Sequence, residues 1–96
     1  MEPFQAFARR DEVRFLDVRE YYEFDAGHIE GAVHIPLGDL AQRAAELPRD
    51  RNVATICEGG YRSSLAASVL AHAGLDRVIS VTGGMAAWRA LQPIHG

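Results

Sequence analysis

The sequence predicts an α/β domain built on a parallel sheet, and two observations support this fold class. Short runs of apolar and β-branched residues alternate with longer segments whose apolar residues recur at helical spacing. Glycine or proline separates many of these segments, as is typical of the ends of helices and strands. Regular alternation of strands and helices favours a parallel sheet with helices on both faces.

In chain order we expect a helix at 4–10, a strand at 13–18, a helical turn at 21–26, a strand at 32–35, a helix at 37–47, a strand at 52–56, a helix at 62–73, a strand at 78–81 and a helix at 85–91. The segment 37–47 is predicted as one continuous helix, because apolar residues recur in it at helical spacing: Leu37, Leu40, Ala41, Ala44 and Leu47. The residues expected to end elements are Gly27, Pro36, Pro48, Gly74 and the pair Gly83–Gly84.

Length and composition limit the possible functions. A chain of 96 residues, 48% of them hydrophobic, is long enough for one small domain, so we expect a single domain over residues 1–96. The net charge of -3 offers no basic face for nucleic acid. No apolar run could span a membrane, and Met1–Phe4 lacks the features of a signal peptide, so a cytoplasmic protein is expected. His34, His72 and His95 show no metal-ligand spacing, so no metal and no cofactor is predicted.

Cys57 is the only cysteine and the leading candidate for a reactive group. It follows a predicted strand and precedes a glycine-bearing loop and a helix start. Amides in such a loop can cradle an anion, and the helix N-terminus adds partial positive charge. Both favour the nucleophilic thiolate. Because the carboxyl ends of parallel strands meet at one edge of the sheet, Asp17–Arg19, Pro36 and Thr82–Gly84 are expected beside Cys57.

Three motifs, found in the expected order, resemble the signatures of the rhodanese family of sulfurtransferases. The first comprises LDVRE at 16–20, EF at 23–24, GHIEGA at 27–32 and HIP at 34–36. The second is CEGGYRS at 57–63, and the third is GGMAAW at 83–88. The resemblance extends over residues 4–91, which is nearly the whole chain.

This resemblance implies a three-layer α/β/α rhodanese-like fold. Its parallel sheet would have four to five strands, since only Met1–Pro3 precede the first helix and could form the family's short first strand. It also implies that Cys57 takes a sulfane sulfur from thiosulfate or a persulfide donor, becomes a persulfide, and passes the sulfur to a thiol or cyanide. The enzyme would be a thiosulfate sulfurtransferase with ping-pong kinetics. The residues expected to form the substrate-binding loop are Glu58, Gly59, Gly60, Tyr61, Arg62 and Ser63.

Two alternative functions remain open. The chain could be a sulfur carrier or partner-binding module, which would relay a persulfide to a protein acceptor without significant turnover of its own. Phosphatase or arsenate reductase activity is less favoured, because four residues separate Cys57 from Arg62, whereas the related dual-specificity phosphatases have five. We expect a monomer or a weak dimer.

Several residues near Cys57 have more than one possible role. Asp17 and Arg19 could be catalytic, but they are expected rather to support the site through an ion pair or loop-fixing hydrogen bonds, with Glu23 as a further partner of Arg19. Glu58 places a carboxylate next to the thiol, and its charge disfavours both the thiolate and a dianionic donor, with only a small effect if the side chain points away. Tyr61 either lines the mouth of the pocket or packs against the fold.

Overall fold

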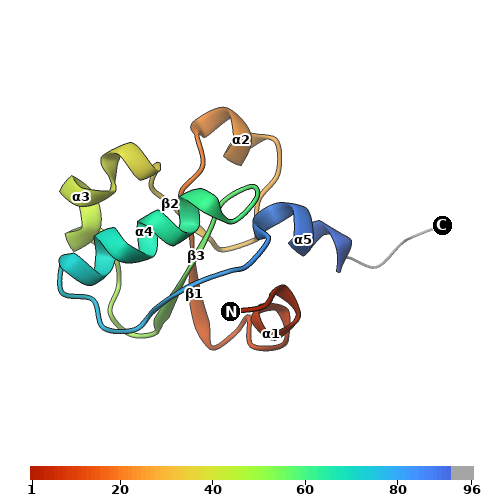
Figure 1. The fold of residues 1–96 in the computed structure, drawn as a ribbon, viewed down its shortest axis with the longest axis horizontal. Coiled ribbons are helices and arrows are strands. Elements are labelled where there is room, and N and C mark those ends of the chain that lie inside the picture. The colour runs from red at the N-terminus through yellow and green to blue at the C-terminus, as the bar shows by residue number, and fades with distance from the viewer. Residues whose placement is uncertain (92–96) are drawn as a thin grey trace.

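Four parallel strands form one sheet in the computed structural model, which describes residues 1–91 (Figure 1). The strands are β1 (Val13–Asp17), β2 (Val33–His34), β3 (Asn52–Ile56) and β4 (Val78–Ser80), and their order across the sheet is β2-β1-β3-β4. β1 is central, and its residue Leu16 pairs with Val33 on one side and Thr55 on the other. The predicted parallel sheet is therefore confirmed. Residues 92–96, which include His95, lie outside the described part of the chain.

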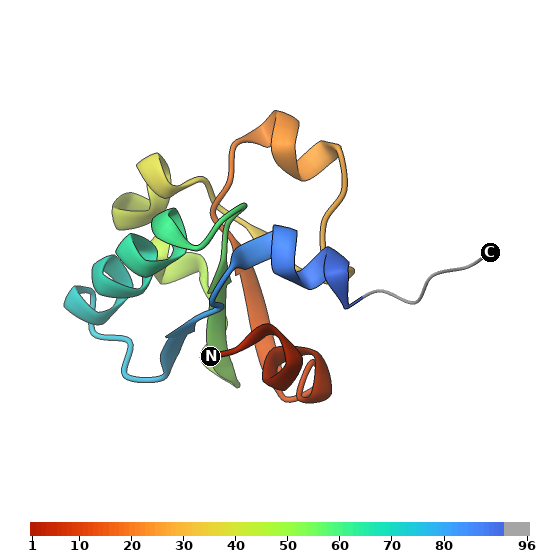
Figure 2. The same cartoon turned by 45° about the vertical axis from the view of Figure 1, so that its right-hand side comes forward.

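Helices cover both faces of this sheet (Figure 2). The helices are α1 (Pro3–Ala8), α2 (Tyr21–Asp25), α3 (Leu40–Arg43), α4 (Tyr61–His72) and α5 (Gly84–Ala90), with 3₁₀ turns η1 (Leu37–Asp39) and η2 (Ala44–Glu46) beside α3, and of these α2 lies beyond the ends of the strands (Figure 2). Leu16 of β1 is buried in one cluster with Leu70 of α4. The preceding residue, Phe15, is buried in a second cluster with Trp88 of α5. Successive strand residues point to opposite faces, so β1 supplies both layers of the core.

One predicted helix is wrong. The segment 37–47 contains η1, the short helix α3 and η2 instead of one continuous helix. Gly38 and Asp39 are weak helix formers, and the Asp39 amide closes a 3₁₀ turn onto the Pro36 carbonyl at 2.9 Å. The apolar residues of this segment that are buried are Leu40, Ala44 and Leu47. The spacing thus identified three buried residues, but Leu37 is only half-buried, Ala41 is exposed, and the backbone is not one helix.

The longest helix, α4, has 12 residues and begins directly after the loop that contains Cys57. Gly60 caps its start with a φ of +105°, a conformation that favours glycine. The Leu75 amide bonds to the Leu70 carbonyl at 3.0 Å and satisfies one of the last carbonyls of the helix. No helix within residues 1–91 is both long and apolar enough to cross a bilayer.

The sheet has four strands in residues 1–91, the lower number that the family resemblance allowed. Met1 nevertheless makes two backbone contacts at the free edge of β4. Its amino group donates to the Ser80 carbonyl at 2.6 Å, and its carbonyl accepts from the Thr82 amide at 2.8 Å. These contacts protect part of an edge that would otherwise expose unpaired backbone groups.

We expect Leu70→Ala to lower the free energy of unfolding by about 2–5 kcal/mol, because Leu70 is fully buried between α4 and the sheet. Leu65→Ala is the matched control, since Leu65 is on the same helix but exposed. That variant should stay within about 0.5 kcal/mol of the wild type. Urea unfolding measures both, and equal losses would contradict the assigned core.

Candidate active site

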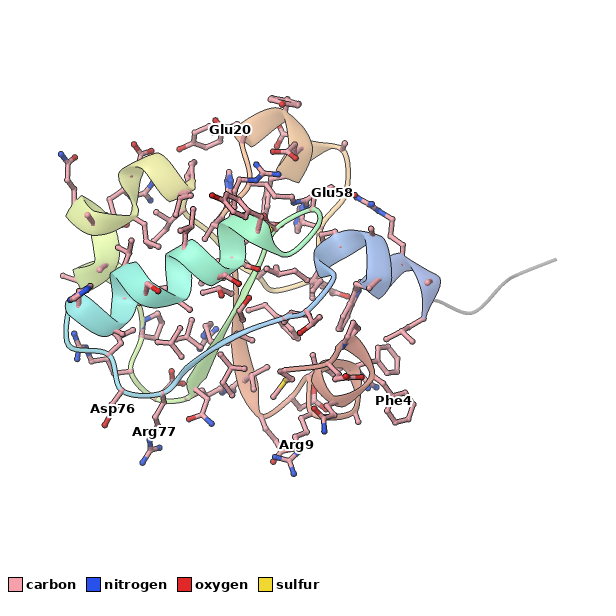
Figure 3. The ribbon with its side chains drawn as sticks, viewed as in Figure 1. Phe4, Arg9, Glu20, Glu58, Asp76 and Arg77 are labelled. Carbon is pink, nitrogen blue, oxygen red and sulfur yellow. The ribbon has the colours of Figure 1, made fainter. Side chains whose placement is uncertain are left out.

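The loop that follows β3 lies at the carboxyl edge of the sheet, and Cys57 is its first residue. Glu58, labelled in Figure 3, lies between the end of β3 and the start of α4, beside the N-terminal end of α5. Cys57 is fully buried and is a free thiol. The sulfur atom is therefore shielded from solvent.

Two backbone amides point at the Cys57 sulfur. The Gly60 amide donates to Sγ at 3.1 Å, and the Ser63 amide donates to Sγ at 3.3 Å. Ser63 lies in the first turn of α4, where amides have no partner within the helix. The loop and the helix N-terminus thus combine into a cradle that favours negative charge on sulfur.

The N-terminus of α5 holds this loop in place. The Met85 amide donates to the Cys57 carbonyl at 2.7 Å, and the Ala86 amide donates to the Glu58 carbonyl at 3.1 Å. Gly84 has a φ of +58°, and a Cβ at this position would overlap the carbonyl oxygens of Cys57 and Glu58. Only glycine permits this approach. Because α5 binds the loop carbonyls, the loop amides that follow are free to point at Sγ.

The pKa of the Cys57 thiol is lowered by its surroundings. Burial raises this pKa, but the Ser63 hydroxyl and the amides of Ser63, Gly60 and Gly59 together outweigh the burial effect. The Ser63 hydroxyl is itself held by the Gly60 carbonyl at 3.0 Å and by the Ser80 hydroxyl at 2.8 Å. A larger share of Cys57 is consequently thiolate at neutral pH than in an ordinary cysteine.

Asp17 and Arg19 form a buried ion pair at the end of β1. Both residues are almost fully buried, and the Arg19 Nη2 lies 2.8 Å from the Asp17 Oδ2. The Asp17 Oδ1 also accepts the Arg19 amide at 3.0 Å. Arg19 further donates to the Gly27 carbonyl at 2.8 Å and approaches Glu58 at 3.4 Å. The pair thus links β1, the segment after α2 and the Cys57 loop.

Arg62 forms a two-point ion pair with Glu23. Its Nη1 and Nη2 donate to the two carboxylate oxygens of Glu23 at 2.7 and 2.9 Å. The expected pairing of Glu23 with Arg19 is therefore wrong. The Arg62 guanidinium lowers the pKa of Glu23 to about 2. This contact joins α2 to α4 and positions the loop between them.

Glu58 points away from the sulfur cradle toward Arg89 of α5. Its oxygens accept from Arg89 at 2.6 and 3.0 Å, and one of them also lies 3.4 Å from Arg19. The hydrogen bond from Arg89 lowers the pKa of Glu58. Arg89 was not predicted as a site residue, because nothing in its sequence neighbourhood indicates that its side chain meets residue 58.

Tyr61 and Gly59 are the exposed residues of the loop. Tyr61 is 78% exposed, so it does not pack against the fold. Gly59 is also exposed, and a Cβ there would meet nothing within 4 Å.

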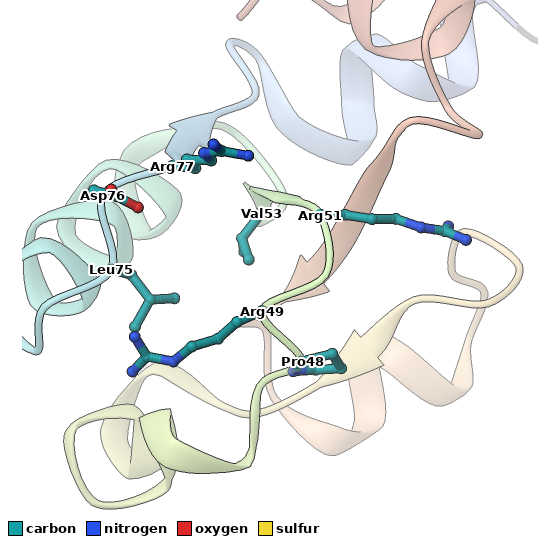
Figure 4. A pocket seen from close by; sticks show the side chains of 7 residues that line it. All are labelled: Pro48, Arg49, Arg51, Val53, Leu75, Asp76 and Arg77. Atoms are coloured by element: carbon teal, nitrogen blue, oxygen red, sulfur yellow. The ribbon is translucent and has the colours of Figure 1, made fainter.

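Two other kinds of site could add chemistry within residues 1–91, a metal site and a pocket away from Cys57. No group of three or more His, Cys, Asp or Glu side chains in this range could hold a metal ion. A pocket of about 270 Å³ lies at the opposite end of the sheet, where β3 and β4 begin. It is lined by Pro48, Arg49, Arg51, Val53, Leu75, Asp76 and Arg77. The Arg49 and Arg51 side chains point in opposite directions, so the guanidinium groups do not converge on one anion (Figure 4).

Comparison with known proteins supports a family relationship. The family model described as rhodanese-like domain matches residues 2–91. YrkF of Bacillus subtilis, named as a candidate sulfur carrier protein, is 42% identical over 89 residues, which cover 92% of this chain and 48% of YrkF. The chain therefore spans about half the length of that relative.

Other relatives match over more of their length. A sulfurtransferase of Allochromatium vinosum is 34% identical over 84 residues, which cover 88% of this chain and 78% of that protein. The crystal structure of a rhodanese-related protein from Thermoplasma volcanium is similar with a TM-score of 0.89 at 30% identity, covering 99% of this chain and 95% of that one. The three-layer architecture of this chain is thus shared with solved structures.

We expect Ser63→Ala to raise the pKa of the Cys57 thiol, because the Ser63 hydroxyl helps to lower it. The rate of alkylation by iodoacetamide as a function of pH measures this pKa, which in the wild type should be lower than that of an ordinary exposed cysteine. Ser64→Ala is the control, since the Ser64 hydroxyl also bonds the Gly60 carbonyl, at 3.2 Å, but is not among the groups that lower the pKa of Cys57. An equal shift in both variants would contradict the assigned role.

The Glu23–Arg62 bridge should stabilise the fold only while Glu23 is ionised. Because the folded-state pKa of about 2 is below the unfolded value, the contribution is complete above about pH 4.3 and disappears as pH falls through about 2. We expect Glu23→Gln to lose about 1–3 kcal/mol at neutral pH and to approach the wild type in acid. Urea unfolding across this range measures the difference. Glu30→Gln, which alters an exposed carboxylate, should show no such convergence.

Proposed function

Since this chain belongs to the rhodanese-like domain family, we propose that it is a sulfurtransferase that carries a sulfane sulfur on Cys57. The observation that carries this proposal is the amide cradle around a buried thiol whose pKa is lowered. A thiolate is the nucleophilic form of cysteine, and fixed amide donors stabilise negative charge that develops beside it. The relative named as a sulfurtransferase supports the same class of activity.

In the first half-reaction, the Cys57 thiolate attacks the sulfane sulfur of the donor. A bond forms between Sγ and that sulfur, and the bond from that sulfur to the remainder of the donor breaks with its electron pair. Sulfite leaves when the donor is thiosulfate, and a thiolate leaves when it is a persulfide. The amides of Gly60 and Ser63 are near enough to Sγ to bind the transferred sulfur.

In the second half-reaction, a thiolate or cyanide attacks the outer sulfur of the Cys57 persulfide. The bond between the two sulfur atoms breaks, and its electron pair returns to Sγ. The product is a persulfide or thiocyanate, and Cys57 is again a thiolate. Such a sequence has two separate half-reactions, so ping-pong kinetics are expected.

The surrounding residues act on Cys57 in two ways. We assign sulfur binding to the loop residues Glu58, Gly59, Gly60, Tyr61, Arg62 and Ser63, through their amides. Arg62 also positions the loop through its two hydrogen bonds to Glu23. Asp17 and Arg19 are positioning residues, because their buried ion pair lies behind the loop and reaches it at Glu58.

A sulfur carrier that does not turn over by itself is the second candidate. The relative YrkF, named as a candidate sulfur carrier, supports it. The complete burial of Cys57 is compatible with it too, because a persulfide that water and small molecules reach poorly can survive until a partner protein arrives.

Phosphatase or arsenate reductase activity is less favoured. In that chemistry the arginine of the loop binds the oxyanion, but both terminal nitrogens of Arg62 are bonded to Glu23. The four-residue spacing from Cys57 to Arg62 also leaves a cradle suited to one sulfur atom.

The test is intact-mass measurement after incubation with thiosulfate and, separately, with glutathione persulfide. The wild type should gain the mass of one sulfur atom, and cyanide or dithiothreitol should remove it. Cys57→Ser should gain nothing, since it lacks the attacking thiolate. Absence of the sulfur adduct with both donors would overturn the proposal. Steady-state turnover with free cyanide then separates an enzyme from a carrier.

A further inference from the structure

Three arginines and three carboxylates surround the Cys57 loop as three close ion pairs, with one longer contact of 3.4 Å between Arg19 and Glu58. The pairs are Asp17–Arg19, Glu23–Arg62 and Glu58–Arg89, with closest N–O distances of 2.8, 2.7 and 2.6 Å. The formal charges of these six groups cancel. None of the three guanidinium groups is therefore available to an anionic substrate unless the substrate displaces a carboxylate of the protein.

The three pairs differ in how easily they can be displaced. The Asp17–Arg19 pair is almost fully buried, and Glu23–Arg62 is partly buried. In the third pair the Glu58 side chain is 41% exposed and the Arg89 side chain 53% exposed. An incoming anion can thus reach Arg89, where it would compete with the carboxylate of the residue next to the nucleophile.

We propose that Glu58 selects the sulfur donor by charge. Its carboxylate occupies Arg89 and approaches Arg19, and it thereby acts as an internal anion that disfavours dianionic donors such as thiosulfate. The favoured donors are persulfides that carry no charge or one negative charge near their sulfur atoms. This inference rests on the proposed sulfurtransferase function and specifies the donor class of the same site.

The charge of each donor explains the difference. A hydropersulfide R–S–SH reacts with the Cys57 thiolate to give Cys57–S–SH and R–S⁻, so one negative charge is present before and after the step. Thiosulfate brings two negative charges to the thiolate, and the step yields Cys57–S–S⁻ and sulfite. The thiolate and thiosulfate together carry three negative charges, in addition to the charge of Glu58. Repulsion between these like charges opposes the reaction with thiosulfate.

Two variants separate this electrostatic role from a structural one. Glu58→Gln and Arg89→Gln break the same ion pair, but they change the local charge in opposite directions. If the pair only fastens the loop to α5, both variants should affect the site in the same direction. If the pair sets the local charge, the effects should be opposite. Glu46→Gln is the control, because it breaks the comparable Glu46–Arg43 pair on η2.

The first measurement uses two alkylating reagents of nearly equal shape, neutral iodoacetamide and negatively charged iodoacetate. Both react with the same Cys57 thiolate, so the ratio of their rates cancels any change in the thiolate fraction or in access. We expect Glu58→Gln to raise the iodoacetate-to-iodoacetamide ratio about two- to fivefold and Arg89→Gln to lower it. The effect should shrink with added salt.

The second measurement compares sulfur loading of Cys57 by thiosulfate and by glutathione persulfide, read by intact mass over time. Glu58→Gln should accelerate loading from thiosulfate more than loading from the persulfide, whereas Arg89→Gln should slow loading from thiosulfate. Glu46→Gln should leave both rates unchanged. Equal effects of Glu58→Gln on both donors, or shifts of the same sign in Glu58→Gln and Arg89→Gln, would overturn the inference.

These outcomes are distinct from failure of the proposed function. If neither donor places sulfur on Cys57, the sulfurtransferase proposal fails, and the donor selection fails with it. If sulfur is loaded but the variants do not change the preference between donors, only the role of Glu58 is wrong. The alkylation ratio reports on the charge near Cys57 in either case, because it requires no sulfur transfer.

Discussion

The contact between the N-terminus of α5 and the Cys57 loop is the interaction on which the site depends. Two amides of α5 bind the carbonyls of Cys57 and Glu58, and Gly84 allows the approach because it has no Cβ. A peptide group of the loop whose carbonyl oxygen points at α5 cannot also point that oxygen at the sulfur. The contact therefore leaves amides on the inner side of the loop, where they lower the pKa of the thiol in spite of its burial.

Charge is arranged around this cradle in closed pairs. The buried Asp17–Arg19 pair gives the loop a rigid support, and breaking it would leave an uncompensated charge in the core. Glu23 and Glu58 bind the remaining arginines near the site. The electrostatic stabilisation of the Cys57 thiolate consequently comes from backbone dipoles more than from unpaired side-chain charges. Such a site favours sulfur donors of low negative charge. The geometry of the loop is therefore the basis for the proposed donor class.

Much of the fold could be predicted from the sequence, because local patterns determine it. Apart from the segment 37–47, the helices and strands lie within two residues of their predicted bounds. That segment failed because Leu40 and Leu47 have the spacing of a buried face, while Gly38 and Asp39 favour tight turns. Apolar spacing reports which residues are buried, and it reports the backbone conformation less directly.

The sequence by itself determined that a lone thiol follows a strand and precedes a glycine loop and a helix start. These features depend on residues that are neighbours in the chain, and backbone geometry then fixes where they lie. Only the tertiary structure decided the partners of the charged side chains. Glu23 meets Arg62 across 39 residues, and Glu58 meets Arg89 across 31. Several arginines could have served each carboxylate, and the packing of α2, α4 and α5 around the sheet selected one.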